Sequence, residues 1–191
     1  MSERHFIFPL GTVLFPGGAL PLKIFEQRYL EMTKVCIRDS RPFGVCLIRE
    51  GAEVGAPAVP ETIGCLATIE EWEMRDLGMF QLVARGGERF RLLDTEVAAN
   101  GLMSGTIERI GEEAPPPVDP ACREVMELIV KQVGDNFPGP VRLDDALWVS
   151  CRLAEGLPLD SAIKQSLLEA DTATRMQRLR DILAAAGLVK G

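Results

Sequence analysis

The chain has 191 residues, of which 47% are apolar and 26% are charged, and a formal net charge of −7. This composition is typical of a globular protein with a buried core, and it excludes a disordered or fibrous chain. Acidic residues outnumber basic ones in both halves of the sequence, which disfavours a broad surface for nucleic acid. No apolar run approaches a membrane span and the N-terminus lacks a signal-peptide pattern, so we expect a cytoplasmic protein without membrane contact.

The first 114 residues carry mainly strand signals. Short strands are predicted at 5–8 and 19–22, and Pro21 marks the second as an edge or bulged strand. A helix is predicted over 26–39, where apolar residues that include Phe25 share one face. Further strands are predicted at 43–49, 64–74, 79–85, 89–97 and 102–110, with turns at Gly78, Gly86-Gly87 and Asn100-Gly101. Short strands with one inserted helix predict a small, partly closed barrel, mostly antiparallel.

A proline-rich connector at 115–120 separates this region from a helical one at 121–191. At its end, Asp119 is a predicted N-cap and Pro120 the first helical residue. Four helices with apolar stripes are predicted: over 121–133, over 144–155, after Asp160 as its capping residue, and from Asp171 or Thr172. The predicted fold class is therefore α+β, with a β-rich domain at 1–114 and a helical bundle at 121–191.

Residues that could carry catalysis or bind a cofactor are sparse. The five cysteines stand singly without a CxxC, which predicts buried free thiols. His5 is the only histidine, so we expect no metal site. The sequence lacks a phosphate-binding loop, a dinucleotide fingerprint and a G-x-S-x-G turn, so we expect no cofactor and no enzymatic activity.

Two charged segments allow a functional and a structural interpretation. The carboxylates of 70–73 could be an acid–base pair, although a solvated strand face is the simpler interpretation. Residues 85–91, Arg-Gly-Gly-Glu-Arg-Phe-Arg, come nearest to a nucleic-acid site, because such sites combine aromatic and basic residues. A glycine hairpin turn with exposed arginines is the favoured interpretation of this segment.

Several segments in order resemble one known family, the N-terminal domain of the Lon ATP-dependent protease. The first is the opening stretch Phe8-Pro9-Leu10, Leu14-Phe15-Pro16-Gly17-Gly18 and Leu20 to Tyr29. The others are Arg41-Pro42-Phe43-Gly44-Val45, Ile63-Gly64-Cys65-Leu66-Ala67, Gly86 to Leu92, and Gln165-Ser166-Leu167-Leu168-Glu169 followed by Thr172 to Leu179.

The resemblance implies a PUA-like pseudo-barrel followed by a helical bundle, the architecture that the residue patterns also indicate. In the protease this domain helps to recognise substrates and to organise the oligomer, without performing chemistry. The 191 residues contain neither the nucleotide loop nor the P-K-D-G-x-S-A-G peptidase segment of the full enzyme. We therefore expect a free-standing bacterial version that lacks the ATPase and the peptidase.

Two functional hypotheses follow. The first is a non-catalytic module that binds unfolded or apolar peptide segments, as an adaptor or holdase-like factor beside a separate protease or chaperone. Exposed aromatic and arginine anchors carry most interface energy, although core packing explains the same residues as well. The candidate contact residues are Phe15, Pro16, Phe25, Arg28, Tyr29 and Trp72. The alternative is an RNA-binding protein that uses the PUA-like barrel.

Overall fold

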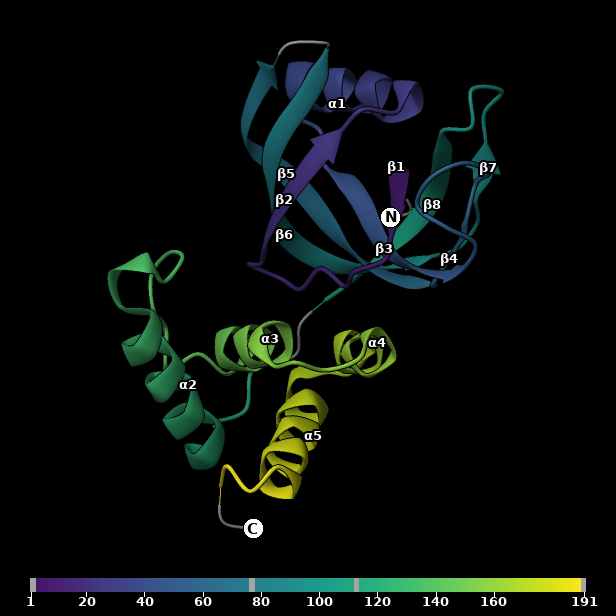
Figure 1. Ribbon diagram of the computed structural model, residues 1–191. Coiled ribbons are helices and arrows are strands. Elements are labelled where there is room, and N and C mark those ends of the chain that lie inside the picture. The colour runs from purple at the N-terminus through teal and green to yellow at the C-terminus, as the bar shows by residue number, and fades with distance from the viewer. Residues whose placement is uncertain (1–2, 76–77, 112–113, 190–191) are drawn as a thin grey trace. The chain divides into compact units, whose positions relative to one another are not determined.

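The computed structural model describes residues 3–75, 78–111 and 114–189. The chain divides into two compact units, residues 1–111 and 112–191, here called the barrel unit and the helical unit (Figure 1). The described part of the barrel unit has the strands β1 (Glu3–Leu10), β2 (Ala19–Ile24), β3 (Phe43–Glu50), β4 (Val59–Pro60), β5 (Ile63–Arg75), β6 (Met79–Leu92), β7 (Glu96–Val97) and β8 (Met103–Ile110), and the helix α1 (Gln27–Asp39).

The strands form one curled sheet in the order β2-β6-β5-β3-β1-β8-β7, and β4 pairs with β3. Neighbouring strands run antiparallel except for β1 and β3, which are parallel. Strand β6 closes the barrel because its first half pairs with β2 and its last residues, Arg89 to Leu92, pair with β8. The predicted α+β pseudo-barrel with one inserted helix is confirmed.

Strands β1 and β3 are buried on both faces, because adjacent residues point into different apolar clusters. Phe8 and Val45 belong to a larger cluster that includes Tyr29 and Met32 of α1. Ile7 and Cys46 belong to a smaller one with Phe90, Ile107 and residues of β5, β6 and β8. Helix α1 therefore covers one side of the sheet, beside the ends of β5 and β6 in Figure 1.

Gly86-Gly87 does not form the predicted hairpin turn, and the two strands expected on either side are the single strand β6. The N–H of Gly17 donates to the Gly86 carbonyl at 2.7 Å, and the N–H of Gly86 donates to the Gly18 carbonyl at 2.8 Å. A Cβ at Gly86 would lie 2.2 Å from the carbonyl oxygen of Phe15. Glycine is present because another segment of backbone crosses the strand there, not because the chain turns.

The helical unit contains, within its described residues, the helices α2 (Pro120–Val133), α3 (Ala146–Gly156), α4 (Ser161–Glu169) and α5 (Thr172–Ala185), and the 3-10 turn η1 (Gly134–Asn136). Asp119 caps α2 by accepting from the N–H groups of Ala121 and Cys122, as its sequence position predicts. Asp160 occupies the N-cap position of α4 but its side chain forms no capping bond there, contrary to the prediction.

Candidate functional site

Strand β2 lies at one end of the strand order, and its only partner among the described strands is β6. Gly86 N–H donates to the Gly18 carbonyl. Main-chain N–H and C=O groups alternate between the two edges of a strand. Because the Gly18 carbonyl faces β6, the main-chain groups of the even-numbered residues Leu20, Leu22 and Ile24 face β6 as well. The odd-numbered residues Ala19, Pro21 and Lys23 then direct their main-chain groups to the free edge. Pro21 fits this edge because it has no N–H to pair.

A pocket of about 170 Å³, here called the edge pocket, borders this free edge. Four consecutive residues of β2, 21–24, line it, although their side chains alternate between the two faces, so the pocket follows the strand's edge. Its other walls are mainly apolar: Phe8 and Leu10 of β1, Phe25, Glu26 and Tyr29 at the start of α1, and Glu53 and Val54 of the β3–β4 loop.

The β3–β4 loop contributes to the rim of the edge pocket. Residues 51–57 are all exposed, and Val54 is 60% exposed. The Glu53 carboxylate accepts a hydrogen bond from the N–H of Gly11, at 2.5 Å, just beyond the end of β1. This bond holds the loop against β1 and keeps Val54 beside the pocket. Phe25, also 60% exposed, is a second apolar side chain on the rim.

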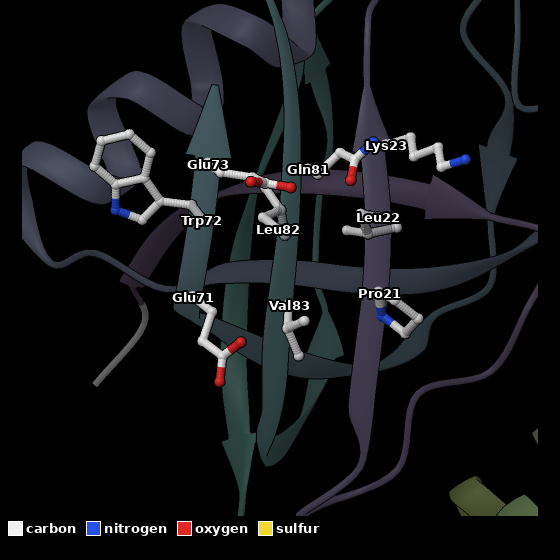
Figure 2. A pocket seen from close by; sticks show the side chains of 9 residues that line it. All are labelled: Pro21, Leu22, Lys23, Glu71, Trp72, Glu73, Gln81, Leu82 and Val83. Carbon is white, nitrogen blue, oxygen red and sulfur yellow. The ribbon is translucent and has the colours of Figure 1, made fainter. Parts of the chain in front are cut away.

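A second, more open groove of about 660 Å³ lies over β2, β6 and β5, and is here called the outer groove (Figure 2). The strand register forms one polar row, Glu73–Gln81–Lys23, and beside it the row Glu71–Val83–Pro21. The groove therefore has an apolar centre at Val83 and Pro21 and carboxylates along one side. In Figure 2 the Trp72 ring points away from Glu71 and Glu73.

The six candidate contact residues lie in different environments. Phe25 is exposed on the rim of the edge pocket, and Trp72 is 51% exposed with its ring edge-on to Phe80 at 5.9 Å. Phe15 is completely buried, and Pro16 is half-buried. The structure does not bring all six together, and Phe25 and Trp72 are the largely exposed members of the set.

Arg28 and Tyr29 are buried and engaged within the barrel unit. The Arg28 guanidinium pairs with Glu26 at 2.8 Å, lies 4.7 Å from the Tyr29 ring centre, and donates to the Gly101 carbonyl at 3.3 Å. The Tyr29 ring lies 4.1 Å from that of Phe8. Burial raises the pKa of the Tyr29 hydroxyl. Arg28 therefore joins α1 to the loop between β7 and β8, and Tyr29 supplies one wall of the edge pocket.

Residues 6–185 match a protein family described as the ATP-dependent protease La (LON) substrate-binding domain. The chain belongs to this family. A structure described as a Lon N-terminal domain protein from Xanthomonas campestris is 33% identical to this Lon-family chain. It has a TM-score of 0.79 and covers 94% of this chain and 98% of its own. The N-terminal domain of Mycobacterium avium complex Lon protease, 16% identical with a TM-score of 0.68, shares the fold over 94% of this chain and 97% of its own.

Among curated proteins, the Lon protease of Anaeromyxobacter dehalogenans is 32% identical over 129 residues, which is 66% of this chain and 15% of that protein. The Lon protease of Methylocella silvestris is 24% identical and matches 96% of this chain but 24% of its own length. The Lon-family chain thus spans a quarter or less of these relatives.

The arginines of this Lon-type barrel are largely paired, contrary to the exposed basic turn considered for residues 85–91. Arg85 bonds to Glu70 at 3.0 Å, and Arg89 is 3% exposed. Arg109 pairs with Glu88 and with Glu3, the latter at 3.0 Å. Arg91 is the exposed arginine of this segment. Because Arg85 and Arg109 lie against carboxylates and Arg89 lies inside the fold, these three charges do not add to a basic surface for a phosphate backbone.

The five cysteines and the single histidine, His5, are all buried. As predicted, the cysteines are buried and form no disulfides. Burial raises the pKa of Cys36 to about 11 and those of Cys46 and Cys122 to about 12, so these thiols are protonated at neutral pH. His5 is buried, 3.1 Å from the Pro42 carbonyl. The described residues contain no metal-binding group of His, Cys, Asp or Glu and no helix able to cross a membrane.

Sequence reasoning singled out Phe25 and Trp72, and it predicted from Pro21 that the second strand is an edge or bulged strand, but it missed Val54 and Leu22 beside that edge. Val54 stands in a loop with glycines and prolines, where no periodicity indicates a role. Pro21, which predicts that β2 is an edge or bulged strand, was the sequence signal nearest to this surface.

Proposed function

We propose that this Lon-family chain is a non-catalytic module that binds apolar segments of unfolded polypeptides in the cytoplasm. The observation that carries the proposal is the edge pocket, an apolar recess with two exposed apolar side chains, Phe25 and Val54, on its rim. Exposed apolar side chains that surround a recess are typical of protein-binding surfaces. Membership of a family named for substrate binding supports the same conclusion.

The finer role that we propose is that of an adaptor or holdase-like factor. An adaptor would hand bound polypeptide to a separate protease or chaperone, whereas a holdase would keep it from aggregating. The buried, protonated thiols and the paired arginines are consistent with a role in binding rather than in catalysis.

The decisive experiment is fluorescence anisotropy with labelled, reduced and carboxymethylated α-lactalbumin, a permanently unfolded probe, against native α-lactalbumin. We expect the wild-type chain to bind only the unfolded form. The double variant Phe25→Ser/Val54→Ser should bind at least roughly thirtyfold more weakly, since two buried anchors at about 1 kcal/mol or more each contribute about 2 kcal/mol or more. The matched control is Leu93→Ser, which removes a similarly exposed apolar side chain that does not line the edge pocket.

Equal affinity for native and unfolded probe would overturn the proposal. So would affinity confined to RNA with a steep salt dependence, which would restore the PUA-like barrel as a nucleic-acid module. Suppression of citrate synthase aggregation by the wild-type chain alone would favour the holdase role. Unfolded-probe binding without such suppression would favour the adaptor.

A further inference from the structure

We propose that the bound polypeptide segment adds as a β-strand to the free edge of β2 and places one large apolar side chain in the edge pocket. This inference rests on the proposed function and specifies how the site is used. The client is thus an extended segment with alternating apolar residues, not a folded surface or a preformed helix.

The main chain of β2 supplies the first argument. Ala19, Pro21 and Lys23 direct three carbonyls and the N–H groups of Ala19 and Lys23 away from β6, and no other described strand pairs with them. Pro21 leaves one gap in the row of donors. An extended peptide can bond to the remaining groups as a new edge strand, which is a general mode of peptide recognition.

The size and lining of the edge pocket supply the second argument. Its volume of about 170 Å³ is close to that of an apolar cavity of about 150 Å³ known to hold benzene. One phenylalanine or leucine side chain therefore fills it, against Phe8, Leu10 and Tyr29. Strand addition places alternate side chains of the peptide on the same face as Leu22 and Ile24, so the pocket and the strand edge select the same extended conformation.

Charge supplies the third argument. The Lys23 side chain is exposed and, within the described part of the chain, forms no ion pair. It lies on the outer face of β2, on the opposite face from Leu22. A residue of the added strand directly across from Lys23 would face the same side, where an acidic side chain gives a favourable cross-strand pair. The expected client pattern is therefore apolar residues toward the pocket and an acidic residue toward Lys23.

The first test leaves the protein unchanged. A ten-residue peptide from carboxymethylated α-lactalbumin that binds the wild-type chain is synthesised with a single N-methyl group at each position in turn. N-methylation removes a main-chain donor and blocks pairing on that side. We expect affinity to fall roughly three- to tenfold at alternate positions and to change little at those between, because only every second N–H faces β2.

The second test changes one main-chain group of the protein. Lys23→Pro removes an N–H that faces the free edge and keeps the pairing with β6, as Pro21 already does two residues earlier. The matched control Lys23→Gln removes the charge and keeps the N–H. We expect Lys23→Pro to weaken the unmodified peptide roughly three- to tenfold, and Lys23→Gln to weaken mainly peptides with the acidic residue.

The outcomes separate this inference from the proposed function. If the wild-type chain binds no unfolded probe, the proposed function fails. If it binds the probe but every N-methylated peptide binds like its parent, strand addition is wrong and the binding function stands. Concentration-dependent dimerisation in analytical ultracentrifugation that Lys23→Pro abolishes would make the occupant of the edge a second copy of this chain, and would overturn the peptide as its occupant.

Discussion

Gly86 lies too close to another segment of backbone to accept a side chain. The substitution Gly86→Ala would place a methyl group 2.2 Å from the Phe15 carbonyl oxygen, a backbone atom that cannot move without displacing the segment before β2. We expect a loss of about 2 kcal/mol or more in the free energy of unfolding, since overpacking costs about 1–3 kcal/mol. Urea denaturation followed by circular dichroism measures this loss.

The neighbouring residue provides the control. At Gly87, an added methyl group meets only Leu66, with the carbonyl oxygen nearest at 3.5 Å, which is ordinary contact. Gly87→Ala should therefore change the stability by less than about 1 kcal/mol. Equal losses for the two variants would show that glycine is needed here for backbone freedom rather than for the close crossing.

Residue identity alone could not separate exposed aromatic residues from buried ones in this chain. Phe15, Phe25 and Tyr29 are aromatic residues of one short segment, yet Phe25 is exposed and the other two are buried. The backbone of Phe15 lies against Gly86 of β6, and the Tyr29 ring packs against Phe8 of β1. Both contacts join segments that are separated in sequence and meet only in the folded chain. The helical periodicity placed Phe25 on the buried face of α1, but the helix begins at Gln27, two residues later.

At the scale of elements, α5 stabilises the end of α4 through one buried guanidinium. Arg175 is fully buried and donates to the Leu167 and Ala170 carbonyls, each at 2.8 Å. Arg175→Met leaves these buried acceptors without their donor, so we expect a loss of about 2–4 kcal/mol in the stability of the helical unit. Thermal unfolding followed by circular dichroism measures it.

Arg178 of α5 is the matched residue. It also donates to a carbonyl of α4, that of Ser166 at 2.9 Å, but its side chain is exposed. Water can replace its hydrogen bond, and Arg178→Met should cost about 1 kcal/mol or less. If both variants lost the same stability, burial of the Arg175 bonds would not be the cause of their strength.

Element boundaries could be predicted where local chemistry determines them. Asp119-Pro120 starts α2, and Asn100-Gly101 connects β7 to β8, because capping and turn geometry depend on a few adjacent residues. The division of β6 was predicted wrongly because the demand for glycine at position 86 comes from a distant segment. The free edge of β2 was indicated by Pro21, but the edge pocket beside it depends on β1 and the β3–β4 loop.

At the scale of the whole molecule, the chain consists of a barrel unit and a helical unit, and each has its own buried thiols. Cys36, Cys46 and Cys65 lie in the barrel unit, and Cys122 and Cys151 lie in the helical unit. In each unit a raised pKa lowers the thiolate fraction at neutral pH, and burial blocks access as well. Reactivity therefore reports where the chain has opened.

Thiol labelling along a urea gradient tests whether the two units unfold as separate domains. A brief pulse of iodoacetamide should leave the native protein unmodified and label all five cysteines when it is fully unfolded. In Arg175→Met we expect Cys122 and Cys151 to label at lower urea than in the wild type, with no shift for the other three. Peptide mass spectrometry resolves the sites. A common shift of all five midpoints would instead show that the units unfold together, because a change confined to one unit then destabilises the whole chain.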